Sequence, residues 1–150
     1  MSSPSNSFEC RWHASRQLLA AYLFAQLFAL GSLFFLDIPL TASLPGALCC
    51  LLHGIWALPR QIWLTHPRAF CGLRRDADGW QLWSRAAGWQ SVQLRPDSLA
   101  LPLVVVLRFR LQGERRVRAI CVPRDSQAVD VHRRLRVRLK FSRRRWAAPE

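Results

Sequence analysis

Cysteine and histidine side chains occur in two short spacings that could bind a metal ion or a haem group. Cys49, Cys50 and His53 form a C-C-x-x-H pattern, and Cys10 and His13 form C-x-x-H. Residues three apart on a helix share a face, so Cys50 and His53 could present a thiolate and an imidazole together. Two ligands do not complete a zinc site, and cysteine is an ordinary residue of apolar interiors. The sequence therefore predicts no metal site and no cofactor.

The motifs of common enzymes do not occur in this sequence, which has no G-x-S-x-G, H-E-x-x-H, P-loop or G-x-G-x-x-G. The four histidines lie apart along the chain, and none stands beside an obvious nucleophile. Asp76-x-Asp78-Gly79 is similar to part of a calcium-binding loop, but it lacks the downstream glutamate, so a hairpin turn is the better interpretation. We therefore expect a protein that binds and does not catalyse.

Arginine supplies nearly all of the positive charge in this chain of 150 residues, whose net charge is +13. Residues 1–59 contain as many acidic as basic residues, so the whole excess lies in residues 60–150. Such an excess implies an anionic counterpart, and anionic lipid, nucleic acid and an acidic protein are the three candidates. Nucleic acid is the least favoured, because no recognised nucleic-acid fold is visible.

Two long runs without charge lie in the N-terminal part of the chain, at residues 17–36 and 38–58. Each has about the length of helix that crosses the hydrocarbon core of a membrane, at about 1.5 Å per residue. Only Asp37 separates them, so the two helices must be antiparallel, with Pro39 in the turn. A signal peptide and a pair of buried core helices are the weaker alternatives, because the first run is long and a second follows at once.

Charges around these runs predict the orientation. Arg11 and Arg16 precede the first run and Arg60 and Arg68 follow the second, whereas the connecting turn has no cation. The positive-inside rule then puts both termini in the cytoplasm. We predict a cytoplasmic N-terminal segment, a two-helix transmembrane hairpin and a basic cytoplasmic domain, over residues 1–16, 17–59 and 60–150.

Small residues at a spacing of four form a stripe on each apolar run, and such stripes let helix backbones approach closely in lipid. Packing of the hairpin on itself is the favoured interpretation, and a homodimer is the alternative. Gln26 lies in mid-membrane and should face the other helix, where it can find a hydrogen bond. The predicted packing residues are Ala21, Ala25, Ala29, Ala42, Gly46, Cys50 and Gly54.

Short apolar segments separated by turn residues predict an antiparallel sheet in the basic domain. The expected strands are residues 70–75, 80–84, 89–94, 103–111 and 115–122. A C-terminal helix should follow, capped by Asp125 or Ser126. Its apolar positions recur near helical spacing and should pack on the sheet, and they are Ala128, Val131, Leu135 and Leu139. The predicted fold class is a membrane α-helical hairpin joined to a small α+β domain.

The last two strands should form a hairpin through the connection at residues 112–114. In the register that follows, the core face consists of Val105, Leu107, Phe109, Val117, Ala119 and Cys121. The opposite face would gather Arg108, Arg110, Arg116 and Arg118 as candidate partner-binding residues. Like charges opposed on a sheet are destabilising, so this face would need an anion. Solvated arginines are the alternative, and a one-residue slip in register would remove the arrangement.

Basic residues also cover the outer face of the C-terminal helix and extend beyond it. A basic run beside a membrane favours contact with anionic lipid, or with a protein partner. The residues are Arg133, Arg134, Arg136, Arg138, Lys140, Arg143, Arg144 and Arg145.

Taken together, these features resemble the YgfX, or toxin CptA, family of small bacterial inner-membrane proteins. The two-helix hairpin carries part of the resemblance, and the likeness covers nearly the full chain. The motifs that carry the rest are Gly72-Leu73-Arg74-Arg75-Asp76, Gly79-Trp80-Gln81-Leu82-Trp83, Arg108-Phe109-Arg110 and Arg133-Arg134-Leu135-Arg136.

The resemblance implies the membrane-bound toxin of a toxin–antitoxin pair in the bacterial inner membrane. It implies two kinds of partner: the cytoskeletal proteins FtsZ and MreB, whose polymerisation is blocked with effects on cell division and shape, and a small cytosolic antitoxin. That antitoxin, YgfY (also called SdhE or CptB), is also a flavinylation factor for succinate dehydrogenase. An accessory or assembly factor of a membrane complex such as succinate dehydrogenase, and an anionic-lipid-binding module, are the alternative functions.

Overall fold

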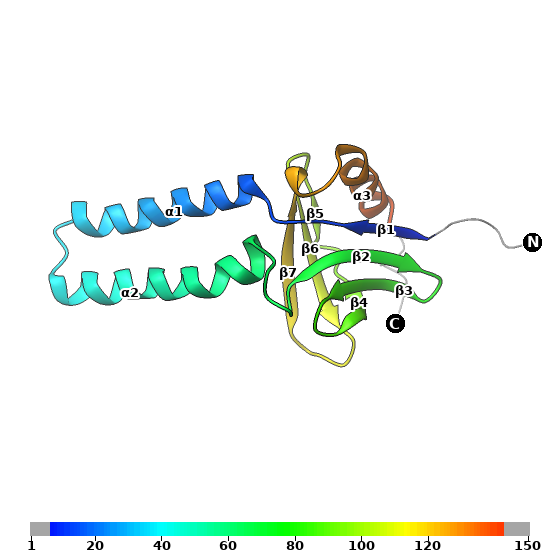
Figure 1. Ribbon diagram of the computed structural model, residues 1–150, viewed down its shortest axis with the longest axis horizontal. Coiled ribbons are helices and arrows are strands. Elements are labelled where there is room, and N and C mark those ends of the chain that lie inside the picture. Colours follow the sequence, from blue (N-terminus) through cyan, green and yellow to red (C-terminus); the bar gives the residue numbers. More distant parts are fainter. Residues whose placement is uncertain (1–6, 143–150) are drawn as a thin grey trace, which may run out of the picture.

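A computed structural model describes residues 7–142, which form a helical hairpin attached to a curled antiparallel sheet (Figure 1). Helix α1 spans Arg16–Phe35 and helix α2 spans Leu40–Ala57, which continues into the π-helical turn η1, Leu58–Ile62. Both helices of the hairpin are long and apolar enough to cross a membrane. The predicted antiparallel pair is therefore confirmed.

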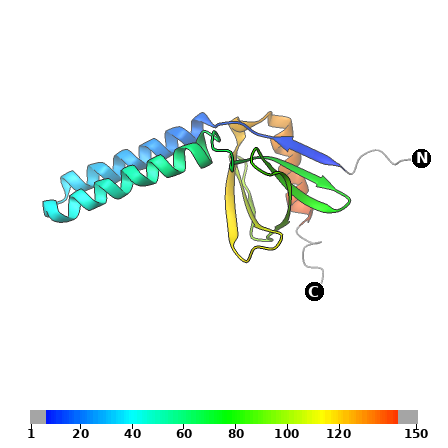
Figure 2. The same ribbon diagram turned by 60° about the horizontal axis from the view of Figure 1, so that its bottom comes forward.

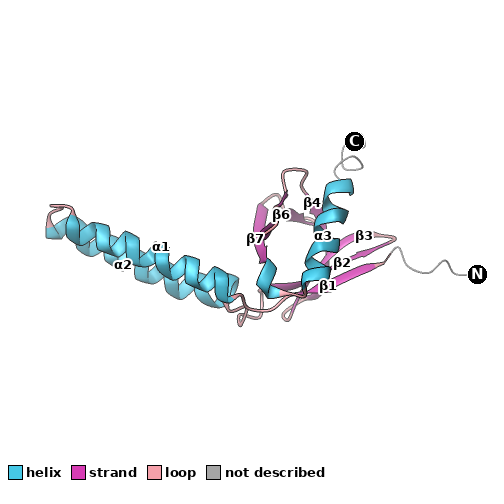
Figure 3. Ribbon diagram, turned by 90° about the horizontal axis from the view of Figure 1, so that it is seen from above, coloured by secondary structure: helices cyan, strands magenta, loops and turns pink. Residues whose placement is uncertain are grey.

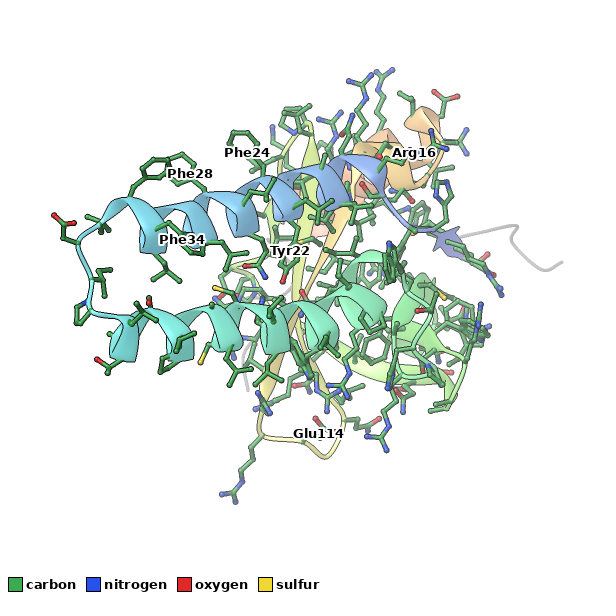
Figure 4. The ribbon with its side chains drawn as sticks, turned by 60° about the vertical axis from the view of Figure 1, so that its left-hand side comes forward. Arg16, Tyr22, Phe24, Phe28, Phe34 and Glu114 are labelled. Carbon is green, nitrogen blue, oxygen red and sulfur yellow. The ribbon has the colours of Figure 1, made fainter. Side chains whose placement is uncertain are left out.

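Polar side chains join the two helices within the hairpin. The Gln26 amide nitrogen donates to the backbone oxygen of Cys50 at 2.8 Å and to the Tyr22 hydroxyl at 2.9 Å. That hydroxyl lies 2.9 Å from Nδ1 of His53, and Figure 4 shows Tyr22 pointing toward α2. In hydrocarbon an unpaired amide is costly, so these bonds fix the rotation of α1 about its axis. The expectation that Gln26 faces the other helix is confirmed.

This rotation separates the two stripes of small residues. A methyl group at Gly46 would lie 3.3 Å from Cδ1 of Leu33, and one at Gly54 would lie 3.6 Å from the Gln26 amide nitrogen, so both glycines face α1. On α1, the side that meets α2 carries Tyr22 and Gln26. The expectation that the alanines pack the hairpin is wrong for the exposed residues, which are Ala21, Ala25, Ala29 and Ala42.

Seven antiparallel strands form one sheet, in the order β1-β2-β3-β4-β6-β5, with β7 paired to β6. Their bounds are β1 Phe8–Arg11, β2 Phe70–Asp76, β3 Gly79–Ser84, β4 Gly88–Leu94, β5 Leu99–Ala100, β6 Val104–Leu111 and β7 Val117–Pro123. All five predicted strands are present. Two strands were not predicted: β1, which precedes the hairpin yet pairs with β2 after it, and the two-residue β5.

Helix α3, Val129–Ser142, packs on the concave side of the sheet and completes the core (Figures 2 and 3). Leu135 and Leu139 are buried there among Leu73, Leu82 and Phe109. The fold class of a helical hairpin with a curled antiparallel sheet and a C-terminal helix is thus confirmed.

The start of α3 differs from the prediction. Asp125 and Ser126 lie in a separate 3-10 turn, η2, Arg124–Ser126, and an N-cap must directly precede its helix. They therefore do not cap α3, which begins at Val129, and Ala128 is exposed instead of packed on the sheet.

Strands β6 and β7 pair one residue out of step with the predicted register. Arg108 lies opposite Ala119, and Phe109 lies opposite Arg118. Arg118 was expected opposite Arg108. Because side chains alternate across a strand, a shift of one residue moves every side chain of β7 to the other face.

The shift buries larger side chains from β7. Val122 is fully buried and Ile120 packs against the core, opposite Val105 and Leu107. Burying isoleucine and valine removes more apolar area from water than burying alanine and cysteine would. The core residues predicted on this strand are therefore wrong, and they are Val117, Ala119 and Cys121, all of which are exposed.

Candidate functional site

A polar joint attaches the hairpin to the domain. The Ser15 hydroxyl donates to Oδ1 of Asp125 at 2.5 Å, the backbone N–H of Gln17 donates to Oδ2 at 3.1 Å, and Leu18 N–H donates to the Ser15 hydroxyl at 3.0 Å. Asp125 thus places a carboxylate at the N-terminus of α1, where the helix dipole favours negative charge.

The charged state of this joint follows from its hydrogen bonds. Burial raises the pKa of the Asp125 carboxyl, but hydrogen bonds from the Ser15 hydroxyl and the Gln17 backbone outweigh that effect and leave the pKa below its ordinary value. The carboxylate is therefore ionised at neutral pH, and it holds the first turn of α1 against the end of β7.

Strand β1 and the residues after it add a second attachment. Trp12 is buried, and its indole N–H donates to the backbone oxygen of Phe70 at 3.1 Å. Its backbone N–H donates to Cys71 O at 3.0 Å, and His13 N–H donates to Ser126 O at 2.9 Å. The N-terminal segment is therefore part of the folded domain, and it brings Arg11 to the edge of the sheet.

The outer face of strands β1 to β4 gathers arginine and tryptophan from segments far apart in sequence. One cross-strand row consists of Arg11, Gly72, Trp83 and Trp89. The adjacent row consists of Glu9, Arg74, Gln81 and Ser91. We call four residues of these rows, exposed Arg11 and half-buried Arg74, Trp83 and Trp89, the arginine–tryptophan face.

Guanidinium groups lie over both tryptophans of this face. The Arg74 guanidinium carbon is 4.4 Å from the centre of the Trp89 ring. The Arg11 carbon is 5.2 Å from Trp83 and 5.8 Å from Trp89. These are cation–π distances. Gly72 makes the arrangement fit, because a methyl group there would lie 3.2 Å from Cβ of Trp83 and 3.5 Å from Cη2 of Trp89.

Further polar contacts hold the two arginines in place. Arg74 donates to the Gln81 side-chain oxygen at 2.6 Å and pairs with Asp76 at 2.9 Å. Arg11 pairs with Glu9 at 3.2 Å. Side chains already ordered lose less entropy when a partner binds, and tryptophan and arginine are the residue types most enriched at binding hot spots. Among the described residues, this face is therefore the candidate interface best supported by ordered side chains and residue type.

The four strand arginines do not form the surface that the sequence predicted. Arg108 forms an ion pair with Asp97, and Arg118 pairs with Glu114 at 2.9 Å from the opposite side of the sheet. The expectation of one shared arginine face is wrong, because it depended on the incorrect register.

The other two arginines of that set also differ in their surroundings. Arg110 donates to the Gln93 side-chain oxygen at 2.9 Å, so its charge is not neutralised by this contact. Arg116 lies before β7, in the exposed loop that follows β6.

On α3, some of the basic side chains are exposed to solvent and others are partly buried. Arg133, Arg134 and Lys140 are exposed, whereas Arg136 and Arg138 are partly buried. The Arg138 guanidinium lies 5.0 Å from the centre of the Phe8 ring. A shallow depression of about 670 Å³ lies between α3 and the start of β1. Arg143, Arg144 and Arg145 lie outside the described residues.

The cysteines show no arrangement for metal chemistry. Burial raises the pKa of the Cys10 thiol to about 12 and also raises the pKa of Cys71, which favours the neutral, unreactive thiol. Within residues 7–142, no three histidine, cysteine or acidic side chains gather around one point. Cys50 contributes its backbone oxygen to the hairpin contact with Gln26.

These features define a class: a small membrane-anchored protein whose β-domain, fixed to a helical hairpin, exposes a face suited to binding. Over residues 6–143 the sequence matches the family described as the membrane-bound toxin component of a toxin–antitoxin system. The chain belongs to this family, which confirms the resemblance. Searches of curated proteins and of solved structures found no match. Family membership implies association with a membrane and an antitoxin partner.

Proposed function

We propose that this toxin acts by binding proteins, without catalysis, and that it blocks polymerisation of the cytoskeletal proteins FtsZ and MreB until a small cytosolic antitoxin counters it. The observation that carries the binding mechanism is the arginine–tryptophan face, with Arg74 stacked at 4.4 Å on Trp89. The named targets come from the resemblance of the chain to its family.

The position of the face supports this mechanism. Strands β1, β2 and β3 extend away from the hairpin, so their outer face is reached from solvent beside the membrane (Figure 1). A binding surface held at a membrane meets membrane-associated targets at a raised effective concentration. A weak contact then suffices to compete with polymerisation along that membrane.

We further propose that the domain lies on the cytoplasmic side of a bacterial inner membrane. Arg16 and Arg60 flank the base of the hairpin, and the Arg60 guanidinium lies 5.2 Å from the Trp56 ring. The opposite turn carries Asp37 and no cation. This asymmetry favours cytoplasmic termini by the positive-inside rule.

Co-purification from detergent-solubilised membranes tests the proposal. Wild type would be compared with Trp89→Ala and with the control Trp63→Ala, whose ring is 49% exposed but lies outside the face. Loss of a hot-spot tryptophan costs about 2 kcal/mol or more, roughly a 30-fold loss in affinity. FtsZ, MreB or the antitoxin should therefore be recovered with wild type and Trp63→Ala, and not with Trp89→Ala.

Each of the other outcomes would contradict either the binding face or the named targets. Equal recovery with Trp89→Ala would show that partners bind elsewhere. Recovery of the antitoxin without FtsZ or MreB would leave the binding face in place and refute the targets. Expression of each variant in growing cells supplies the second readout, since Trp89→Ala should lose growth inhibition while the protein remains in the membrane.

A further inference from the structure

The sheet has a second exposed surface, on the strands nearest the base of the hairpin. Figures 1 and 3 show β7 as the strand closest to the ends of α1 and α2, with α3 farther from the hairpin. We call this surface the β6–β7 outer face. It consists of Val104, Val106, Arg108, Arg110, Val117, Ala119 and Cys121.

The polar joint keeps this face close to the hairpin. Strand β7 ends at Pro123, and Asp125, two residues later, accepts hydrogen bonds from Ser15 and from the backbone of Gln17. Strand β7 runs across the direction of the hairpin in Figure 1. A strand attached to the first turn of a membrane-spanning helix, and running across it, lies along the membrane surface.

Apolar side chains on and beside this face are exposed where a soluble domain would carry polar ones. Val117 is 37% exposed, and Leu103, the residue before β6, is 66% exposed. Ala119 and Cys121 are also exposed along β7. Such a strip suits the boundary between headgroups and acyl chains, where small apolar groups gain from partial burial.

Arginines without a counter-charge border the strip. Arg115 and Arg116 are exposed in the loop before β7, and within the described residues no ion pair or hydrogen bond engages either side chain. Glu114, the acidic residue of this loop, pairs with Arg118. Figure 4, with the hairpin side forward, shows the loop at Glu114 clear of α2, so the hairpin does not cover it.

We infer that the β6–β7 outer face, with Arg115 and Arg116, rests on the bilayer that the hairpin spans and binds anionic phospholipid headgroups. The two guanidinium groups pair with lipid phosphates, and their aliphatic stems lie along the apolar strip. Basic residues near an anionic membrane surface gain about fivefold in binding per residue. This surface is separate from the arginine–tryptophan face, so the contact orients that face without occupying it.

Lipid titration of the full chain in a non-ionic detergent tests the inference. Phosphatidylglycerol would be added, with phosphatidylcholine as the neutral comparison, and bound lipid counted by native mass spectrometry. The test variant is Arg115→Gln/Arg116→Gln, and the matched control is Arg133→Gln/Arg134→Gln, which removes the same charge from exposed positions on α3. Circular dichroism verifies that both variants are folded.

The expected result is a fall of roughly 25-fold in phosphatidylglycerol binding for the loop variant and little change for the α3 control. An equal fall in both variants would show attraction by net charge alone and overturn the inference. A fall only in the α3 control would show that lipid binds at that helix instead. No fall in either variant would show that neither surface binds anionic lipid. Recovery of protein partners by the loop variant is measured separately, so failure here leaves the proposed function untouched.

Discussion

The two outer faces of one curled sheet use arginine in opposite ways. On β1 to β4, Arg11 and Arg74 are stacked on tryptophans and tied to Glu9, Gln81 and Asp76. Beside β7, the neighbouring arginines Arg115 and Arg116 extend from a loop with no such support.

The difference separates two kinds of recognition. Ordered side chains present one shape and suit a protein partner with a matching surface. Exposed charged side chains without fixed partners suit a fluid array of phosphates, where position matters less than charge. A count of arginines along the chain would treat the two faces as equivalent, and only their neighbours distinguish them.

Of the further changes that test this comparison, Gly72→Val has the largest expected effect, and it alters the arginine–tryptophan face alone. The added side chain would begin 3.2 Å from Cβ of Trp83 and displace Trp89. We expect partner recovery to fall at least tenfold, with a stability loss of about 1–3 kcal/mol from overpacking. Ala119→Val, at an exposed position of β7 outside this face, is the control and should change neither quantity. Full partner recovery by Gly72→Val would show that the tryptophan arrangement is not needed for binding.

Asp125→Ala should loosen the second face from the membrane. It removes the acceptor for the Ser15 hydroxyl and the Gln17 N–H, and a hydrogen bond to a charged group contributes about 1.5–3 kcal/mol. Thermal unfolding of the purified chain should show a lower midpoint than wild type, whereas Asp78→Ala, in the exposed turn before β3, should not. An unchanged midpoint would mean that Trp12 and β1 alone hold the joint.

Acid should weaken the same joint in wild type. The pKa of Asp125 is lowered in the folded protein, so its stabilising contribution is complete above the ordinary value of 3.8 and is lost as the pH falls through the folded value. Unfolding followed between pH 5 and pH 2 should therefore show a loss in wild type that is smaller in Asp125→Asn. Parallel curves for the two proteins would contradict this assignment.

The smallest effect is expected within the hairpin, away from both faces. Gln26→Leu removes the hydrogen bonds to Cys50 O and Tyr22, and such interhelical bonds contribute about 0.6–2 kcal/mol in membranes. Resistance of the hairpin to unfolding in detergent should fall by that amount. Ala25→Leu, on the exposed side of α1, should leave the hairpin unchanged, and a loss of self-association in that variant would support a homodimer through the alanine stripe.

The charge-free runs and the spacing of turn residues in the sequence were sufficient to predict most of the fold. Two charge-free runs separated by Asp37 predict a hairpin whatever the rest of the chain does, because the hydrocarbon core sets the helix length. Turn residues between apolar segments likewise predicted β2, β3, β4, β6 and β7. Strand β1 was not predicted because its four residues, Phe8–Arg11, are too few to show the alternating pattern of a strand.

The arginine–tryptophan face could not be predicted, because it depends on which strands pair and in which register. The sequence alone determined the hairpin, five of the seven strands and the excess of arginine, since each follows from local composition and spacing. Only the tertiary structure decided which arginines stand together, because a one-residue change in the β6–β7 register moves every side chain of β7 to the other face. It also placed Arg11 beside Trp83 and Trp89, because that contact requires β1, which precedes the hairpin, to pair with β2, which follows it.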